Sequence, residues 1–172
     1  MKLQVHNYAF IDGQNLYLAI RSLDWKLDYK KFRIYLSEKY SVTKAYIFLG
    51  YLPSNQPLYS FLISAGFELI YKPILNRDGL VKGNCDAELV LQAMIDFQNY
   101  NKALIVTGDG DFYCLINYLN KCDKLLQLLI PNAHKYSNFF RSSAYGKLDF
   151  MNNLKNKLEY KKERQLHKDS PL

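Results

Sequence analysis

Long apolar runs and paired cysteines are both missing from this chain of 172 residues. No run of about eighteen apolar residues occurs, which excludes a membrane span. The first residues also lack the apolar stretch of a secretory signal, so we expect a cytoplasmic protein. Only three cysteines are present (Cys85, Cys114 and Cys122), and they form no close pairs. This spacing argues against a zinc site, and we expect three reduced thiols, some of them in the core.

Acidic residues are the scarcer charged class, with 16 Asp and Glu against 23 Lys and Arg. The net charge of +7 makes a polyanion a natural partner, although a surplus of Lys is also common on soluble surfaces. The length fits one domain, and 49% hydrophobic residues suffice for a sizeable core. Composition therefore predicts a folded, basic, single-domain protein.

Short apolar runs alternate with amphipathic segments along the chain. The predicted strands cover residues 8–11, 42–49, 67–71, 103–107 and 125–130. The predicted helices cover residues 15–21, 29–40, 58–65, 86–98 and 112–120, and residues 76–79 resemble a loop. The alternation favours βαβ units, and therefore an α/β fold with a central, mainly parallel sheet flanked by helices.

The end of the chain differs in composition, and we separate a domain over 1–150 from a basic helix or tail over 151–172. Residues 155–172 hold six Lys or Arg against three acidic residues. Met151, Leu154 and Leu158 are spaced for one helix face, and a second face would carry Lys157, Lys161, Arg164 and Lys168. Such a helix could pack its apolar stripe against the domain. Its basic face could instead bind a phosphate backbone, and a single helix could do both.

Four acidic residues are predicted to meet at one edge of the sheet. Asp12 ends the first strand, Asp109 and Asp111 follow the strand 103–107, and Asp86 opens a helix. Ligands of parallel α/β sheets bind beyond the carboxyl ends of the strands, which is where these side chains fall. Carboxylates so close together repel one another, and an oxygen-only ligand set favours Mg²⁺ or Mn²⁺.

Each acidic residue also has a purely structural interpretation. Asp86 and Asp111 are favourable helix caps, and Asp12-Gly13 and Asp109-Gly110 are turn-forming pairs. The functional interpretation depends on all four sharing one sheet edge.

Three motifs occur in order along the chain. They are Tyr8-Ala9-Phe10-Ile11-Asp12-Gly13-Gln14-Asn15, then Lys82-Gly83-Asn84-Cys85-Asp86, then Val106-Thr107-Gly108-Asp109-Gly110-Asp111-Phe112. Together they resemble the NYN domain family of the PIN-like nuclease superfamily, over residues 6–150. The resemblance implies a PIN-like three-layer sandwich and a Mg²⁺-dependent active site that acts on RNA.

The resemblance also assigns residues. The family's acidic positions fall on Asp12, Asp86, Asp109 and Asp111, its accompanying Asn on Asn15, and its small hydroxyl residue on Thr107. Arg141 matches a late segment and is expected to touch phosphate. Asp96 matches a further acidic position but follows Asp86 by nearly three helical turns, so we interpret it as structural. Tyr145-Gly146-Lys147 departs from the family pattern, and Asp149 is left without a role.

The sequence thus predicts a metal-dependent ribonuclease in which a metal-activated water hydrolyses a phosphodiester of single-stranded RNA. Lys82 and Arg77 are expected to contact the RNA backbone. Tyr51 is a candidate for stacking on a base, but we favour a packing role for it, because the chain is rich in Tyr and Phe. The alternative is a non-cleaving RNA- or nucleotide-binding regulatory module. Two other enzyme classes are disfavoured. An aspartyl phosphatase would need an acidic residue at position 14, where the chain has Gln14, and a Rossmann enzyme would need a glycine-rich turn after the first strand, which the chain lacks. Homodimerisation and a regulatory protein partner stay open.

Overall fold

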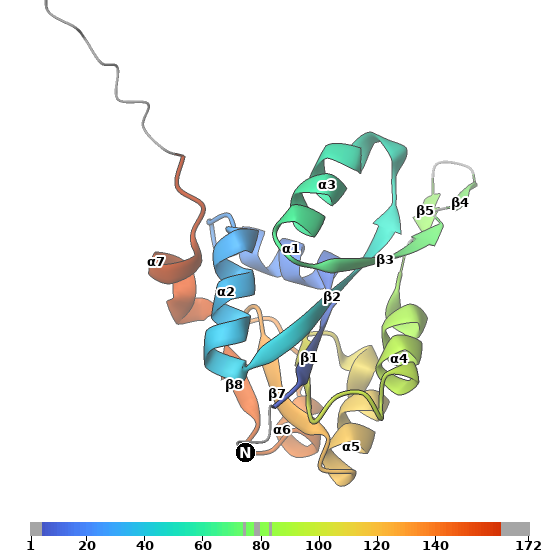
Figure 1. Ribbon diagram of the computed structural model, residues 1–172, viewed down its shortest axis with the longest axis vertical. Helices are drawn as coiled ribbons and strands as arrows, with labels where there is room; N and C mark the ends of the chain where they lie inside the picture. Colours follow the sequence, from blue (N-terminus) through green and yellow to red (C-terminus); the bar gives the residue numbers. More distant parts are fainter. Residues whose placement is uncertain (1–4, 74, 78–79, 83, 163–172) are drawn as a thin grey trace, which may run out of the picture.

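Six parallel strands form the central sheet, in the order β3-β2-β1-β6-β7-β8. The computed structural model describes residues 5–73, 75–77, 80–82 and 84–162, with only the backbone described at 75–77 and 80–82 (Figure 1). The strands are β1 (Asn7–Asp12), β2 (Val42–Tyr51), β3 (Glu68–Pro73), β6 (Ala103–Val106), β7 (Leu125–Ile130) and β8 (Leu148–Phe150). The predicted parallel α/β fold is confirmed.

Helices cover both faces of the sheet. One face carries α1 (Gly13–Arg21), α2 (Tyr29–Tyr40), α3 (Gln56–Ser64) and α7 (Lys155–Leu158), and the other α4 (Asp86–Ile95), α5 (Tyr113–Lys121) and α6 (Phe140–Ser143). Short 3₁₀ turns lie at Pro53–Asn55, Gly110–Phe112 and Asn152–Leu154. Two cores result, one on each side of the sheet. This is the three-layer sandwich that the sequence predicts.

Strand β1 shows why these sequences form buried strands. Ala9 and Ile11 enter one core, whereas Phe10 enters the other, and all three are fully buried. Successive side chains of a strand point to opposite faces, so a strand with helices on both sides needs apolar residues at every position. The same holds for β6, where Leu104 and Ile105 are divided between the two cores.

The strand order reverses direction between β1 and β6. From β1 the chain builds outward to β2 and β3, and it then returns to place β6 on the opposite side of β1. Open α/β sheets bind their ligands at such a reversal, beyond the carboxyl ends of the strands. The ends of β1 and β6 are therefore the expected place for a site, and they carry Asp12 and the segment Thr107 to Asp111.

Two strand pairings were absent from the sequence prediction. The segment predicted as a loop contains an antiparallel hairpin of β4 (Leu75–Arg77) and β5 (Leu80–Lys82), which lies beyond the end of β3 (Figure 1). Strand β8 closes the sheet beside β7, and its Asp149 accepts hydrogen bonds from Lys39 and Tyr40 of α2. Each of these strands has only three residues, too few to show a periodic pattern of its own.

Of the predicted basic helix or tail over residues 151–172, the described residues form only the short helix α7. Met151 and Leu158 are fully buried and Leu154 packs against the same core, as an apolar stripe requires. Helix α7 nevertheless ends at Leu158, because Glu159 forms an antiparallel bridge to Leu27. The continuation through Arg164, Leu166 and Lys168 lies outside the described residues.

Gly13 is where α1 packs against the sheet, and it has no room for a side chain. An added Cβ would lie 2.5 Å from Leu49 Cδ2 and 2.8 Å from the Phe48 carbonyl oxygen. We expect Gly13→Ala to lower the free energy of unfolding by about 1–3 kcal/mol through overpacking. Urea unfolding measures this, with exposed Gln14→Ala as the control that should stay within about 0.5 kcal/mol. Equal stability of both variants would contradict this account of the contact.

Among the described residues, no helix combines the length and apolar character that crossing a membrane requires. Cys85, Cys114 and Cys122 form no disulfide, and the last two are exposed rather than in the core.

Candidate metal centre

Asp12 lies at the junction of β1 and α1 and serves as the helix N-cap. Its Oδ1 accepts a hydrogen bond from the Asn15 backbone N at 3.0 Å, and its Oδ2 accepts one from Thr107 Oγ1 at 3.2 Å. The pKa of Asp12 is raised from 3.8 to about 6, mainly by burial and to a smaller extent by the charges of Asp86 and Asp109, which together outweigh these two hydrogen bonds. Asp12 is therefore held rigidly in a position that disfavours its charge.

Thr107 and Asn15 hold the acidic loop against β1. The Thr107 hydroxyl accepts a hydrogen bond from the Asp109 backbone N at 3.1 Å while it donates to Asp12. Asn15 Oδ1 accepts one from the Gly108 backbone N at 2.8 Å. Asn15 thus positions the loop through its side chain, and Thr107 connects two of the predicted acidic residues.

The acidic loop also packs against the segment that contains Ser137. Gly108 accepts a backbone hydrogen bond from Ser137 N at 3.0 Å. A Cβ added to Gly110 would lie 2.6 Å from Ser137 Oγ, so a larger residue would push the turn outward. Only glycine therefore lets Asp109 and Asp111 share this turn, where Asp111 N donates to Asp109 Oδ1 at 3.1 Å.

Asp86 reaches the site from the first position of α4. Asn84 Nδ2 donates to its Oδ2 at 2.6 Å, and Asp86 N donates to Asn84 Oδ1 at 2.9 Å. Lys72, near the end of β3, donates to the Asn84 carbonyl at 2.7 Å and pairs with Glu88 at 3.5 Å. Burial raises the pKa of Asp86, and Asp109 and Asp111 add to this, while Asn84 and Lys72 counter it.

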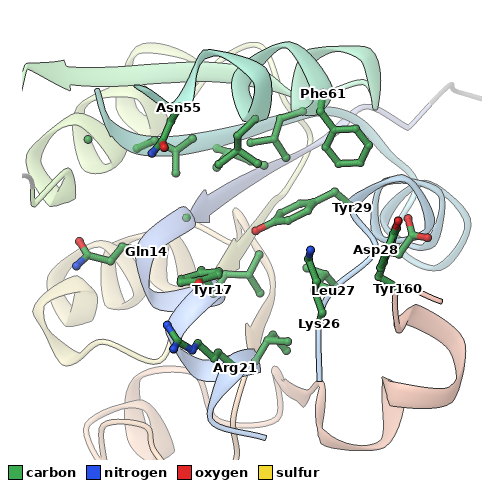
Figure 2. A pocket seen from close by; sticks show the side chains of 18 of the residues that line it. Gln14, Tyr17, Arg21, Lys26, Leu27, Asp28, Tyr29, Asn55, Phe61 and Tyr160 are labelled. Atoms are coloured by element: carbon green, nitrogen blue, oxygen red, sulfur yellow. The ribbon is translucent and has the colours of Figure 1, made fainter. Parts of the chain in front are cut away.

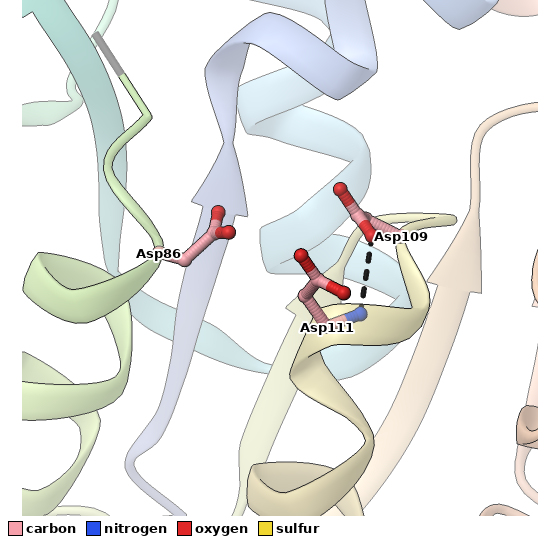
Figure 3. Close-up of side chains that lie close together, drawn as sticks. All are labelled: Asp86, Asp109 and Asp111. Atoms are coloured by element: carbon pink, nitrogen blue, oxygen red, sulfur yellow. Dashed lines mark hydrogen bonds between the residues drawn. The ribbon is translucent and has the colours of Figure 1, made fainter. Parts of the chain in front are cut away.

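Asp86, Asp109 and Asp111 converge on one point. Each offers a carboxylate oxygen, and these three atoms lie within 4.8 Å of one another. Figure 3 shows Asp86 extending from α4, past the end of β1, toward the turn that carries Asp109 and Asp111. Asp12 is outside this group of three, although it is close enough for Asp86 and Asp109 to affect its pKa.

Three carboxylates at this separation form an oxygen-only set that fits a hard divalent cation. Neither His nor Cys belongs to the set, which favours Mg²⁺ or Mn²⁺ over zinc. Lys72, the cation that lowers the pKa of Asp86, already bonds Asn84 and Glu88. The mutual repulsion of the three acids is therefore poorly compensated by the protein, and a bound cation would offset it.

The other predicted residues are less central. Arg141 is exposed on α6, while Arg77 and Lys82 end β4 and β5 with side chains outside the described part. Asp96 is buried, with hydrogen bonds from Tyr46, Gln92 and Asn99, which agrees with a structural role.

Tyr51 belongs to an aromatic cluster with Tyr59 and Tyr71, as expected of filler, although 41% of it is exposed. The supporting roles of Lys72, Asn84 and Ser137 were not predicted. Asn84 and Ser137 did carry a local signal, because Asn84 belongs to the second motif and Ser137 to the late segment that includes Arg141.

The parallel sheet, its reversal point and the acidic cluster together define an α/β protein with a candidate metal centre at the carboxyl edge of its sheet. The family model of the NYN domain matches residues 8–157, and the chain therefore belongs to the NYN domain family, whose members are in general PIN-like nucleases.

A crystal structure of a protein of unknown function from Vibrio parahaemolyticus has the same fold, with a TM-score of 0.73. The two chains are 22% identical, and the match covers 88% of this chain and 95% of that one. No curated protein matches the chain.

Proposed function

We propose that this protein is a metal-dependent ribonuclease that hydrolyses phosphodiester bonds of single-stranded RNA. The convergence of Asp86, Asp109 and Asp111 within 4.8 Å at the reversal point of a parallel sheet carries the proposal. Membership of a nuclease family and a net charge of +7 support it, since a basic protein attracts a polyanion. Mg²⁺ or Mn²⁺ is the proposed cofactor.

Each acidic residue has a distinct part in this proposal. Asp86, Asp109 and Asp111 hold the cation through carboxylate oxygens. When bound, such an ion polarises a phosphodiester and lowers the pKa of an attacking water. Asp12 lies behind the group, where it adds negative charge and, held by Thr107, fixes the acidic loop. Asn15 positions this loop from α1. Arg77, Lys82 and Arg141 are proposed to contact the RNA backbone.

The test is cleavage of a labelled single-stranded RNA in Mg²⁺, in Mn²⁺ and in EDTA. We expect cleavage in both metals and none in EDTA, and the variant Asp86→Asn should lose most of the activity. Asp24→Asn is a matched control, because Asp24 is exposed and its φ of 58° suits asparagine. RNA binding without cleavage under every metal would contradict the enzyme and support the non-cleaving regulatory module.

A further inference from the structure

A pocket of about 1030 Å³ lies between α1 and α3, over the sheet face opposite to α4 and α5. Its floor includes Ile47 and Leu49 of β2, and Figure 2 shows the side chains that enclose it. This volume lies at the upper limit of the 300–1,000 Å³ typical of small-ligand sites, so there is room for more than one ring system. No residue of the acidic group lines it.

One mouth of the pocket adjoins the acidic edge. Gly13 and Gln14 line it and directly follow Asp12 in the chain, while Gly50 and Asn55 line it from the β2–α3 side. Figure 2 places the amide groups of Gln14 and Asn55 at the same end of the pocket, on facing walls. Amide side chains can hydrogen-bond the edges of unpaired bases.

The walls are aromatic and carry positive charge. Tyr17 is 53% exposed and Phe61 38% exposed, although both are large apolar side chains. Arg21 and Lys26 are exposed in the lining. The one acid of the lining, Asp28, accepts a hydrogen bond from Lys31 N at 3.1 Å and pairs with Lys31 Nζ at 3.6 Å. The free charge of the pocket is therefore positive.

Polar groups also point inward. Figure 2 shows Tyr29 extending into the pocket with its hydroxyl foremost, and Lys26 extending from the opposite wall. Burial raises the pKa of Tyr29 to about 12, and nearby Tyr17 adds to the shift, so the hydroxyl stays protonated and can donate a hydrogen bond. Flat apolar walls with donors and cations at their ends match a nucleobase joined to a phosphate.

We propose that this pocket binds unpaired nucleotides of the RNA that flank the scissile phosphate, with bases against Tyr17 and phosphates on Arg21 and Lys26. The inference rests on the proposed ribonuclease function for its substrate class, because the pocket opens beside the acidic edge. Duplex RNA keeps its bases stacked inside the helix and cannot place them here. The pocket therefore selects single strands.

Trp25 gives a direct test, because it is the single tryptophan of the chain and lines the pocket. Its fluorescence would be titrated with a short single-stranded RNA in EDTA, so that binding is measured without cleavage. We expect a saturable change with the single strand and none with the same sequence as a duplex. Tyr17→Ala should weaken binding at least about fivefold, because stacking contributes about 1–3 kcal/mol per base. Arg21→Ala should weaken it and flatten its salt dependence.

Matched controls are Tyr145→Ala, which removes a ring that is 85% exposed, and Lys121→Ala, which removes an exposed cation of α5. Both should leave the titration unchanged. Equal losses in the controls, equal responses to duplex, or RNA binding without any Trp25 change would overturn the proposal. A Trp25 response to an acidic amphipathic peptide, with none to RNA, would assign the pocket to a protein partner instead.

The same experiments distinguish a wrong assignment of the pocket from an absence of ribonuclease activity. Metal-dependent cleavage without a Trp25 response would leave the ribonuclease standing and remove the pocket from its substrate path. A selective Trp25 response without cleavage in any metal would leave a single-strand-binding pocket in a protein that does not hydrolyse RNA.

Discussion

Asp109→Asn is expected to lower metal-dependent RNA cleavage about a thousandfold or more. The substitution removes one of three carboxylates that converge on the candidate cation, and metal stabilisation of a transition state amounts to several kcal/mol. Each 1.36 kcal/mol corresponds to a tenfold change in rate. The amide can still accept the hydrogen bond from Asp111 N, so the turn should keep its shape.

The double variant Asp109→Asn/Asp111→Asn makes the prediction sharper. If both residues hold the same ion, the second change removes little that the first has left, and the double variant should be about as inactive as either single one. Initial rates with saturating metal measure this, with Asp24→Asn as control. Losses that multiply across the two sites would contradict a shared ion and indicate separate functions.

Asp12→Asn is expected to stabilise the metal-free protein while it impairs cleavage. The folded-state pKa of Asp12, about 6, lies above its ordinary 3.8, so folding favours the protonated form. The carboxyl therefore costs stability as pH rises from about 4 to 6, and the full cost of roughly 3 kcal/mol applies above that range. The amide has one accepting oxygen where the carboxylate has two, and this loss offsets part of the gain, which leaves a net gain of about 1–2 kcal/mol at pH 7.

Unfolding in urea with EDTA, at pH 7 and at pH 4, measures both parts of this expectation. The advantage of Asp12→Asn should shrink by about 2 kcal/mol at pH 4, where the wild-type carboxyl is protonated in the folded state. Asp24→Asn is the control for the same chemical change at an exposed position. A difference between Asp12→Asn and the wild type that is the same at both pH values would mean that burial of this charge does not limit stability.

The central strands and the acidic edge could be predicted because their signals are local. Residues 8–11 and 103–106 are continuous apolar runs; Asp12 directly follows the first, and Asp109 follows the second after two residues. A parallel sheet brings such strand ends together. The placement of Asp12, Asp109 and Asp111 at one edge followed from that rule, whereas Asp86 was placed there as the first residue of a helix. Their assignment as ligands or catalytic residues stays a prediction.

What could not be predicted depends on contacts between distant segments. Strand β8 has three residues and pairs with β7 across a loop, and the end of α7 is set by the bridge between Glu159 and Leu27. The pocket likewise arises between helices that no local pattern places side by side. Lys72 supports Asp86 through Asn84 across 12 positions, and an isolated Lys in a strand carries no signal of that function.

The hydrogen bond between Thr107 and Asp12 spans 95 positions, and it joins the two halves of the acidic edge. Because synthesis proceeds from the N-terminus, Asp12 leaves the ribosome long before β6 and the turn with Asp109 and Asp111 exist. The loop behind that turn, which contains Ser137, is made later still. The acidic edge can therefore reach its final arrangement only after the chain has been made through Ser137.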